Sequence, residues 1–98
     1  MSKPTLGIIG GGQLGSMLAI AANKLEIKNV IFCDDIDAPA QNFSKNFVHG
    51  QYNDQNKIKE FIDKVDVITY EFENIPYKTL HEINKIKPVL PKPSVNRI

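Results

Sequence analysis

A cluster of glycines follows the first apolar segment of the chain. Gly10, Gly12 and Gly15 have the G-x-G-x-x-G spacing of a nucleotide-binding turn, and Gly11 lies between the first two. Glycine lets backbone N–H groups approach an anion closely, and a helix that begins near Gln13 adds its positive end at the same place. The pattern predicts a phosphate-binding turn, although glycines also serve a tight connection between strand and helix.

Two carboxylates follow a later apolar segment. In the stretch YEFENIP, Glu71 and Glu73 come after a predicted strand at 65–70 and share one face if that strand continues. A buried carboxylate must find a partner, and ribose offers two adjacent hydroxyl donors. Acidic residues at strand ends are also common as solvated loop residues or ion-pair partners, so the pattern alone leaves both interpretations open.

The two histidines and the cysteine lack partners at the spacing of a metal site or a catalytic site. His49 and His81 have no Cys or His at metal-ligand spacing, which favours surface or boundary positions. Cys33 lies inside a predicted strand, which favours a packed thiol, and a single cysteine excludes an internal disulfide. The sequence therefore predicts neither a catalytic residue nor a metal site in this chain.

Strands and helices must alternate to position these residues. Short apolar runs predict strands at 5–9, 29–34, 46–50 and 65–70, and KPVLPKP predicts a possible fifth strand. This order is typical of the doubly wound α/β class, here a Rossmann-like parallel sheet of about four to five strands with helices on both faces. Right-handed crossovers then give the strand order 3-2-1-4, with a ligand crevice at the carboxyl ends of strands 1 and 4.

Helices are predicted between the strands. Asp37 before Pro39 predicts a short capped helix, and Asn53 or Asp54 predicts the cap of the next one. A last helix is predicted from 74–76 onward. Apolar residues at helical spacing predict that the first helix turns one face to the core, namely Leu14, Met17, Leu18, Ala21, Ala22 and Leu25.

Length and charge narrow the class of protein. Ninety-eight residues make one domain, and twelve basic against eleven acidic residues give a formal net charge of +1. This balance lacks the basic excess typical of nucleic-acid or anionic-membrane binding. The first apolar run is too short for a signal peptide or a membrane span, so the sequence predicts a soluble cytoplasmic domain.

One functional hypothesis is the NAD(P)-binding domain of an oxidoreductase. The glycine motif follows a strand and opens a helix, and Asp34 or Asp35 comes about 20 residues later, where a ribose-binding acid belongs. This hypothesis does not account for TYEFENIP, and hydride transfer would need a further substrate domain.

A second hypothesis comes from three segments taken together. IIGGGQLGSMLAIAA, CDDIDAPAQNF and VDVITYEFENIP, in this order, resemble the N5-carboxyaminoimidazole ribonucleotide synthetase family, also called the ATPase subunits of phosphoribosylaminoimidazole carboxylase. The resemblance runs from about Leu6 to Pro93. It implies a pre-ATP-grasp domain over 1–93, followed at 94–98 by the start of a linker to an ATP-grasp domain that the chain lacks.

The resemblance also implies a reaction in purine biosynthesis. In this family ATP activates bicarbonate as carboxyphosphate, and the carboxyl group passes to the exocyclic amine of 5-aminoimidazole ribonucleotide. ATP and magnesium are held by the ATP-grasp domains, so their ligands are expected outside this chain. The chain is expected to be inactive alone and to need those domains, on the same or a second chain; family members are often homodimers.

Binding residues are carried over from the family by position. Gly12, Gln13 and Leu14 are expected nearest the phosphate and ribose, and Glu71 is expected on the ribose hydroxyls, with Glu73 as the weaker candidate. Ser16 stands where members of the family commonly carry a basic residue. The full set of predicted substrate-binding residues is Gly10, Gly11, Gly12, Gln13, Leu14, Gly15, Glu71 and Glu73.

Overall fold

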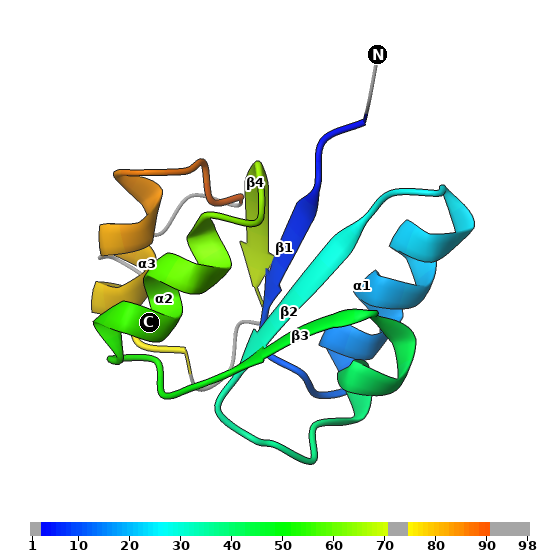
Figure 1. The fold of residues 1–98 in the computed structure, drawn as a ribbon, viewed down its shortest axis with the longest axis horizontal. Helices are drawn as coiled ribbons and strands as arrows, with labels where there is room; N and C mark the ends of the chain where they lie inside the picture. Colours follow the sequence, from blue (N-terminus) through cyan, green and yellow to red (C-terminus); the bar gives the residue numbers. More distant parts are fainter. Residues whose placement is uncertain (1–2, 71–74, 91–98) are drawn as a thin grey trace.

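The chain folds around a single parallel sheet. The computed structural model describes residues 3–70 and 75–90. In this part of the chain the sheet has four strands in the order β3-β2-β1-β4, which confirms the predicted fold class and strand order. All three strand pairs are parallel, so the carboxyl ends meet at one edge, the lower edge in Figure 1. The strands are β1 (Leu6–Ile9), β2 (Asn29–Cys33), β3 (Asn46–His49) and β4 (Val67–Tyr70).

Helices cover both faces of the sheet, as predicted. Helix α1 and the 3-10 helix η1 lie on one face, while α2 and α3 lie on the other (Figure 1). Each helix connects two strands or follows the last one, as expected for parallel strands joined by crossovers. Their bounds are α1 (Gln13–Lys24), η1 (Pro39–Phe43), α2 (Gln55–Ile62) and α3 (Tyr77–Asn84).

The possible fifth strand is reduced to one bridge beside β4. Val89 pairs in parallel with Ile68. The Ile68 N–H donates to the Pro88 carbonyl at 2.9 Å, and the Leu90 N–H donates to the Ile68 carbonyl at 2.8 Å. This short contact covers the middle of the β4 edge, and the rest of KPVLPKP, from Pro91, lies outside the described residues.

The face under α2 and α3 is packed with large side chains. The rings of Phe32 and Phe61 stack with centroids 5.4 Å apart, and Tyr52 meets Phe32 edge-on at 5.7 Å. Branched aliphatic residues fill the space around them. We call this group the large-residue layer; its most buried members are Ile9, Phe32, Phe61, Val65, Ile68, Ile83 and Val89.

The face under α1 and η1 is packed with small side chains. We call this group the small-residue layer; it consists of Ile8, Ala19, Ile31, Cys33, Ala38 and Ala40. The predicted inward face of α1 is wrong for Leu14, Met17 and Leu25, which are 38%, 57% and 61% exposed, and for Ala21, which is also exposed. It is confirmed for Ala22, which is buried, and Leu18 packs against this layer. Small side chains let the helix lie close to the sheet, so the buried face of α1 is Gly15, Ser16, Ala19 and Ala22.

The helix caps agree with the sequence in one case and differ in another. Asp54 caps α2, with one carboxylate oxygen accepting from the N–H groups of Asn56 and Lys57 at 3.1 and 3.2 Å. The predicted Asp37 cap of η1 is wrong: the capping position is Ala38, which offers no side-chain bond. Asp37 lies in the preceding turn.

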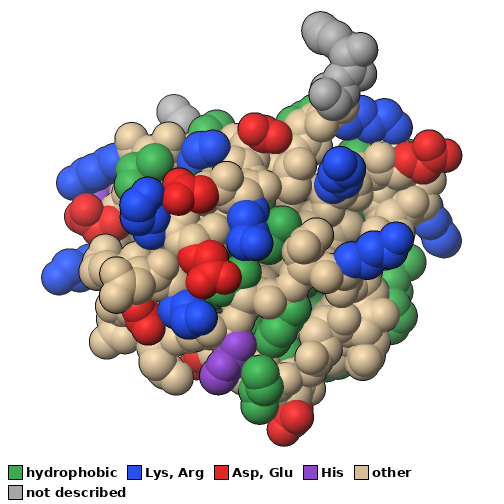
Figure 2. Space-filling view, in the orientation of Figure 1, with side chains coloured by type: hydrophobic (Ala, Val, Ile, Leu, Met, Phe, Trp, Pro, Cys, Tyr) green, Lys and Arg blue, Asp and Glu red, His purple; other side chains and the backbone are tan. Residues whose placement is uncertain are grey.

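The described surface carries charges of both signs. On the face seen in Figure 2, basic and acidic side chains are interspersed, mostly over α2 and α3. Exposed pairs such as Lys59–Asp63, at 3.1 Å, contribute little to stability. His49 and His81 are exposed and Cys33 is buried, as predicted. Within the described residues, none of the helices is both long and apolar enough to cross a membrane.

Candidate functional site

The glycine turn leaves the sheet beside the last residue of β4. Ile9 and Tyr70 are paired, and each ends its strand. Gly10 follows directly after Ile9, so the turn starts at the crevice predicted between β1 and β4. Glu71 and Glu73 lie outside the described residues, and their position in the site stays a prediction.

Gly10 requires glycine for its backbone conformation. Its φ is 109°, a region that L residues with a side chain rarely adopt. Its N–H donates to the Phe32 carbonyl at 2.8 Å, which extends the β1–β2 pairing by one residue. The turn therefore begins from a fixed point on β2.

Gly11 requires glycine for a different reason. Its φ is not positive, but a Cβ added here would lie 2.5 Å from the Ala38 Cβ and 3.1 Å from the Cys33 Sγ. Its carbonyl accepts from the Ala40 N–H at 2.9 Å. The turn is thus held against the segment that leads into η1.

Gly12, Gln13 and Leu14 form the start of α1. Gly12 is the N-cap, and Gln13 and Leu14 are exposed in the first turn, whereas Gly15 is buried. The first turn of α1 contains no acidic residue. The helix end, equivalent to roughly half a positive charge, is therefore not neutralised by its own first-turn side chains and favours an anion.

Ser16 adds a side-chain hydrogen bond to this helix start without adding charge. Its side chain is buried, and both its N–H and its hydroxyl donate to the Gly12 carbonyl at 2.9 Å. A basic side chain would bring a charge of its own to this position. With serine here, attraction for an anion at the turn comes from the backbone and the helix end.

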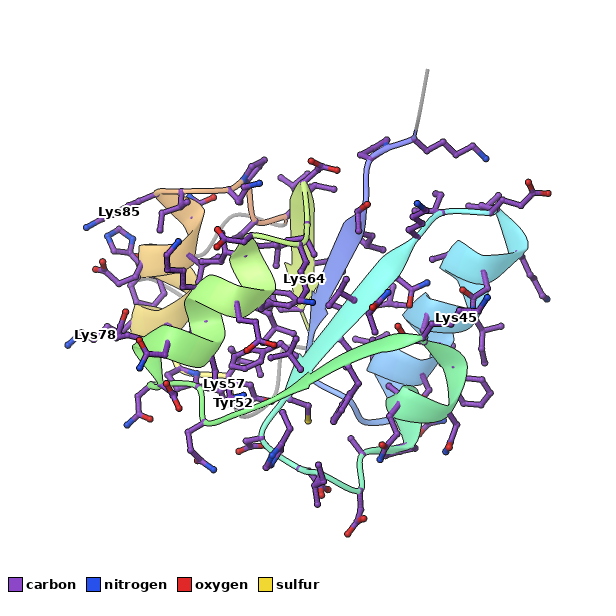
Figure 3. The ribbon with its side chains drawn as sticks, viewed as in Figure 1. Lys45, Tyr52, Lys57, Lys64, Lys78 and Lys85 are labelled. Carbon is purple, nitrogen blue, oxygen red and sulfur yellow. The ribbon has the colours of Figure 1, made fainter. Side chains whose placement is uncertain are left out.

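A contact between the half-buried Tyr52 and the buried Cys33 was not found from the sequence. The Tyr52 hydroxyl donates to the Cys33 Sγ at 3.7 Å, and Figure 3 shows Tyr52 on the α2 side of the sheet. Burial, together with the hydrogen bond to Cys33, raises the pKa of Tyr52 well above its usual value. The Tyr52 ring also packs edge-on against Phe32, so the contacts of this residue are those of a packing residue. No spacing motif links these two residues, which are 19 positions apart.

Metal-binding chemistry is not seen in the part of the chain that the structure describes. Residues 3–70 and 75–90 contain no group of three His, Cys, Asp or Glu side chains close enough to hold a metal ion. The chemistry available at the turn is recognition of an anionic group by backbone and helix end.

Comparison with known protein families decides which fold family this turn belongs to. Residues 3–98 match the model of the ribonucleotide synthetase preATP-grasp domain. The chain belongs to this family. The match favours the ribonucleotide synthetase hypothesis over the oxidoreductase hypothesis, which shares the same glycine spacing.

Relatives of the preATP-grasp family confirm this assignment. The N5-carboxyaminoimidazole ribonucleotide synthase of Staphylococcus epidermidis is 39% identical over 82 residues, which cover 84% of this chain and 22% of that protein. The crystal structure of the Staphylococcus aureus synthetase with ADP has a TM-score of 0.81 and 38% identity, over 88% of this chain and 24% of that one.

A third relative was solved with two bound nucleotides. The Aspergillus clavatus synthase, in complex with ADP and 5-aminoimidazole ribonucleotide, has a TM-score of 0.75 and 29% identity, over 89% of this chain and 23% of that one. The chain thus spans about a quarter or less of the length of these relatives.

Proposed function

We propose that this chain is the ribonucleotide-binding domain of an ATP-dependent N5-carboxyaminoimidazole ribonucleotide synthase. The observation that carries the proposal is the glycine turn, which opens α1 at the carboxyl edge of β1 beside the end of β4. Membership of the preATP-grasp family and the ribonucleotide complex of the Aspergillus clavatus relative support it.

The proposed reaction divides between this domain and ATP-grasp domains. ATP activates bicarbonate as carboxyphosphate, and the exocyclic amine of 5-aminoimidazole ribonucleotide accepts the carboxyl group. The ADP and ATP complexes of relatives support the use of ATP. We assign ATP and magnesium to the ATP-grasp domains, on the same or a second chain, and the ribonucleotide to this domain.

The roles of the turn residues rest on local geometry and family positions, whereas those of Glu71 and Glu73 rest on family positions alone. The turn at 10–15 binds the phosphate and part of the ribose through backbone groups and the α1 end. Glu71 binds the ribose hydroxyls, and Glu73 has the smaller role. We assign 1–93 to the domain and 94–98 to the start of the linker. The enzyme is proposed to act in the cytoplasm, and a homodimer is the assembly that the resemblance to the family suggests.

Binding by the 98-residue chain tests the proposal directly. Amide chemical shifts are followed by NMR during titration with 5-aminoimidazole ribonucleotide, with its phosphate-free riboside and NAD as matched controls. We expect the ribonucleotide to shift the amides of residues 10–15. Losing the charge-assisted phosphate contacts should weaken the riboside roughly tenfold or more. Shifts with NAD but none with the ribonucleotide would restore the oxidoreductase hypothesis.

Glu71→Gln tests the ribose contact. We expect ribonucleotide affinity to fall roughly tenfold, because a charge-assisted hydrogen bond contributes about 1.5–3 kcal/mol. Glu73→Gln is the matched control with the smaller effect. Titration of both variants by NMR provides the comparison, and equal affinity of Glu71→Gln and the parent would remove Glu71 from the site.

ATP turnover tests the division of labour. We expect the 98-residue chain to show no bicarbonate-dependent ATP hydrolysis in the presence of 5-aminoimidazole ribonucleotide, because the ATP-binding residues are assigned elsewhere. A coupled assay for ADP release measures this. Turnover by the pure chain would contradict the division, even if the ribonucleotide bound as proposed.

A further inference from the structure

The segment between β2 and η1 packs directly behind the glycine turn. Ala38 and Ala40 are 1% and 0% exposed and belong to the small-residue layer. A Cβ on Gly11 would come within 2.5 Å of the Ala38 Cβ, which is closer than two such carbons can approach. The turn and the segment therefore touch with no room for one additional methyl group.

A backbone hydrogen bond sets the direction of the contact. The Ala40 N–H donates to the Gly11 carbonyl at 2.9 Å. Because a trans peptide is planar, its C=O and N–H point in opposite directions. Fixing the Gly11 carbonyl toward η1 therefore orients the whole peptide between Gly11 and Gly12, the peptide that leads into α1.

The segment is itself held in one conformation. The Asp37 N–H donates to an Asp35 carboxylate oxygen at 2.9 Å, and the Ala38 N–H donates to the Asp35 carbonyl at 3.1 Å. Pro39 occupies the first turn of η1, where its fixed φ suits a helix start. The Ala40 N–H, one of the donors that a helix start leaves unpaired within the helix, is thus presented to Gly11.

We propose that Ala38 and Ala40 are positioning residues for the ribonucleotide site. Ala38 sets how closely the turn approaches the segment that leads into η1, and the Ala40 N–H sets the orientation of the Gly11–Gly12 peptide. This role rests on the proposed function and adds the DAPA segment, Asp37–Ala40, as the support behind the phosphate turn.

A rescue experiment tests the Gly11–Ala38 contact. Gly11→Ala should lower affinity for 5-aminoimidazole ribonucleotide roughly tenfold or more, because the added methyl displaces the turn from its binding geometry. Ala38→Gly removes the carbon nearest to that methyl while leaving the Ala40 N–H in place. Alone, it loosens the support behind the turn and should lower affinity about threefold. The double variant, in which the Gly11 methyl fills the space that Ala38 leaves, should recover to within about threefold of the parent.

The same variants report on turn geometry without any ligand. The NMR scalar coupling across the hydrogen bond from the Ala40 nitrogen to the Gly11 carbonyl carbon should be present in the parent and in Ala38→Gly. It should be lost in Gly11→Ala and should return in the double variant. Thermal unfolding is recorded in parallel, so that affinity is compared only for folded protein.

The outcomes separate this inference from the proposed function. If the parent binds the ribonucleotide but the double variant binds no better than Gly11→Ala, the methyl blocks the ligand itself and the positioning role is overturned. Coupling unchanged in Gly11→Ala would overturn it as well. If the parent fails to bind the ribonucleotide, the proposed function fails, and the role of Ala38 and Ala40 at a ribonucleotide site fails with it.

Discussion

The two faces of the sheet are packed on different principles. The large-residue layer under α2 and α3 contains stacked aromatic rings and branched aliphatic side chains. The small-residue layer under α1 and η1 has three alanines from the helical side, with Ile8, Ile31 and Cys33 from the sheet. Large side chains remove the most apolar surface from water, whereas small ones allow backbones to come close.

This difference assigns separate tasks to the two faces. We infer that the large-residue layer supplies most of the hydrophobic stability. The small-residue layer holds the glycine turn against β2 and η1 through backbone contacts, such as the bond from the Ala40 N–H to the Gly11 carbonyl. Variants of the two layers should therefore affect stability and binding in different proportions.

Phe61→Ala should have the largest effect on stability. Phe61 is fully buried and stacks on Phe32, so the loss of its ring should cost about 3–5 kcal/mol of unfolding free energy. Urea unfolding followed by far-UV circular dichroism measures this change. Folded Phe61→Ala should keep the ribonucleotide affinity of the parent within about threefold. A small loss of stability, or a large loss of affinity, would contradict the inference that the two layers have separate tasks.

Ala19→Leu should also destabilise the protein, but by less, and through overpacking rather than through a cavity. Ala19 is fully buried between α1 and the sheet, and overpacking typically costs about 1–3 kcal/mol. Ala21→Leu is the matched control, because Ala21 is exposed on the outer side of the same helix. Thermal unfolding of both variants gives the comparison. Equal destabilisation would show that helix propensity, rather than close packing, decides the result.

Glu26→Gly should have the smallest effect and should increase stability. Glu26 follows the end of α1 with a φ of 59°, a conformation that costs a residue with a side chain about 1–2 kcal/mol. Part of the gain is lost to the greater freedom of glycine in the unfolded chain, so about 0.5–1 kcal/mol is expected. Urea unfolding checks the sign. A loss of stability would mean that the Glu26 side chain contributes more than its backbone costs.

The sequence predicted the fold better than the packing. Predicted strands that alternate with helices, joined by right-handed crossovers, gave the strand order β3-β2-β1-β4, and the structure confirms it. The inward face of α1 was predicted only in part, because Ala22 is buried, whereas Leu14, Met17 and Leu25 repeat at helical spacing yet lie on the outside. Hydrophobic spacing identifies an apolar face, but it does not tell whether small residues on another face pack more closely.

For the candidate site, local motifs were informative and distant contacts were not. The glycine spacing located the turn, and the strand order located the crevice beside β4. No pattern in the sequence relates Gly11 to Ala38, since their contact arises only when β2 and η1 are folded beside the turn. Glu71 and Glu73 lie outside the described residues.

The outer face of α1 has a consequence for the protein in solution. Leu14, Met17 and Leu25 leave apolar surface in water, and the isoelectric point of about 7.8 leaves little net charge near neutral pH. Molecules that carry little net charge and expose apolar patches attract one another at high concentration. We expect colloidal stability to be poorest near pH 7.8 and to improve when Met17 is replaced by lysine. Samples for titration are therefore best kept dilute and away from that pH.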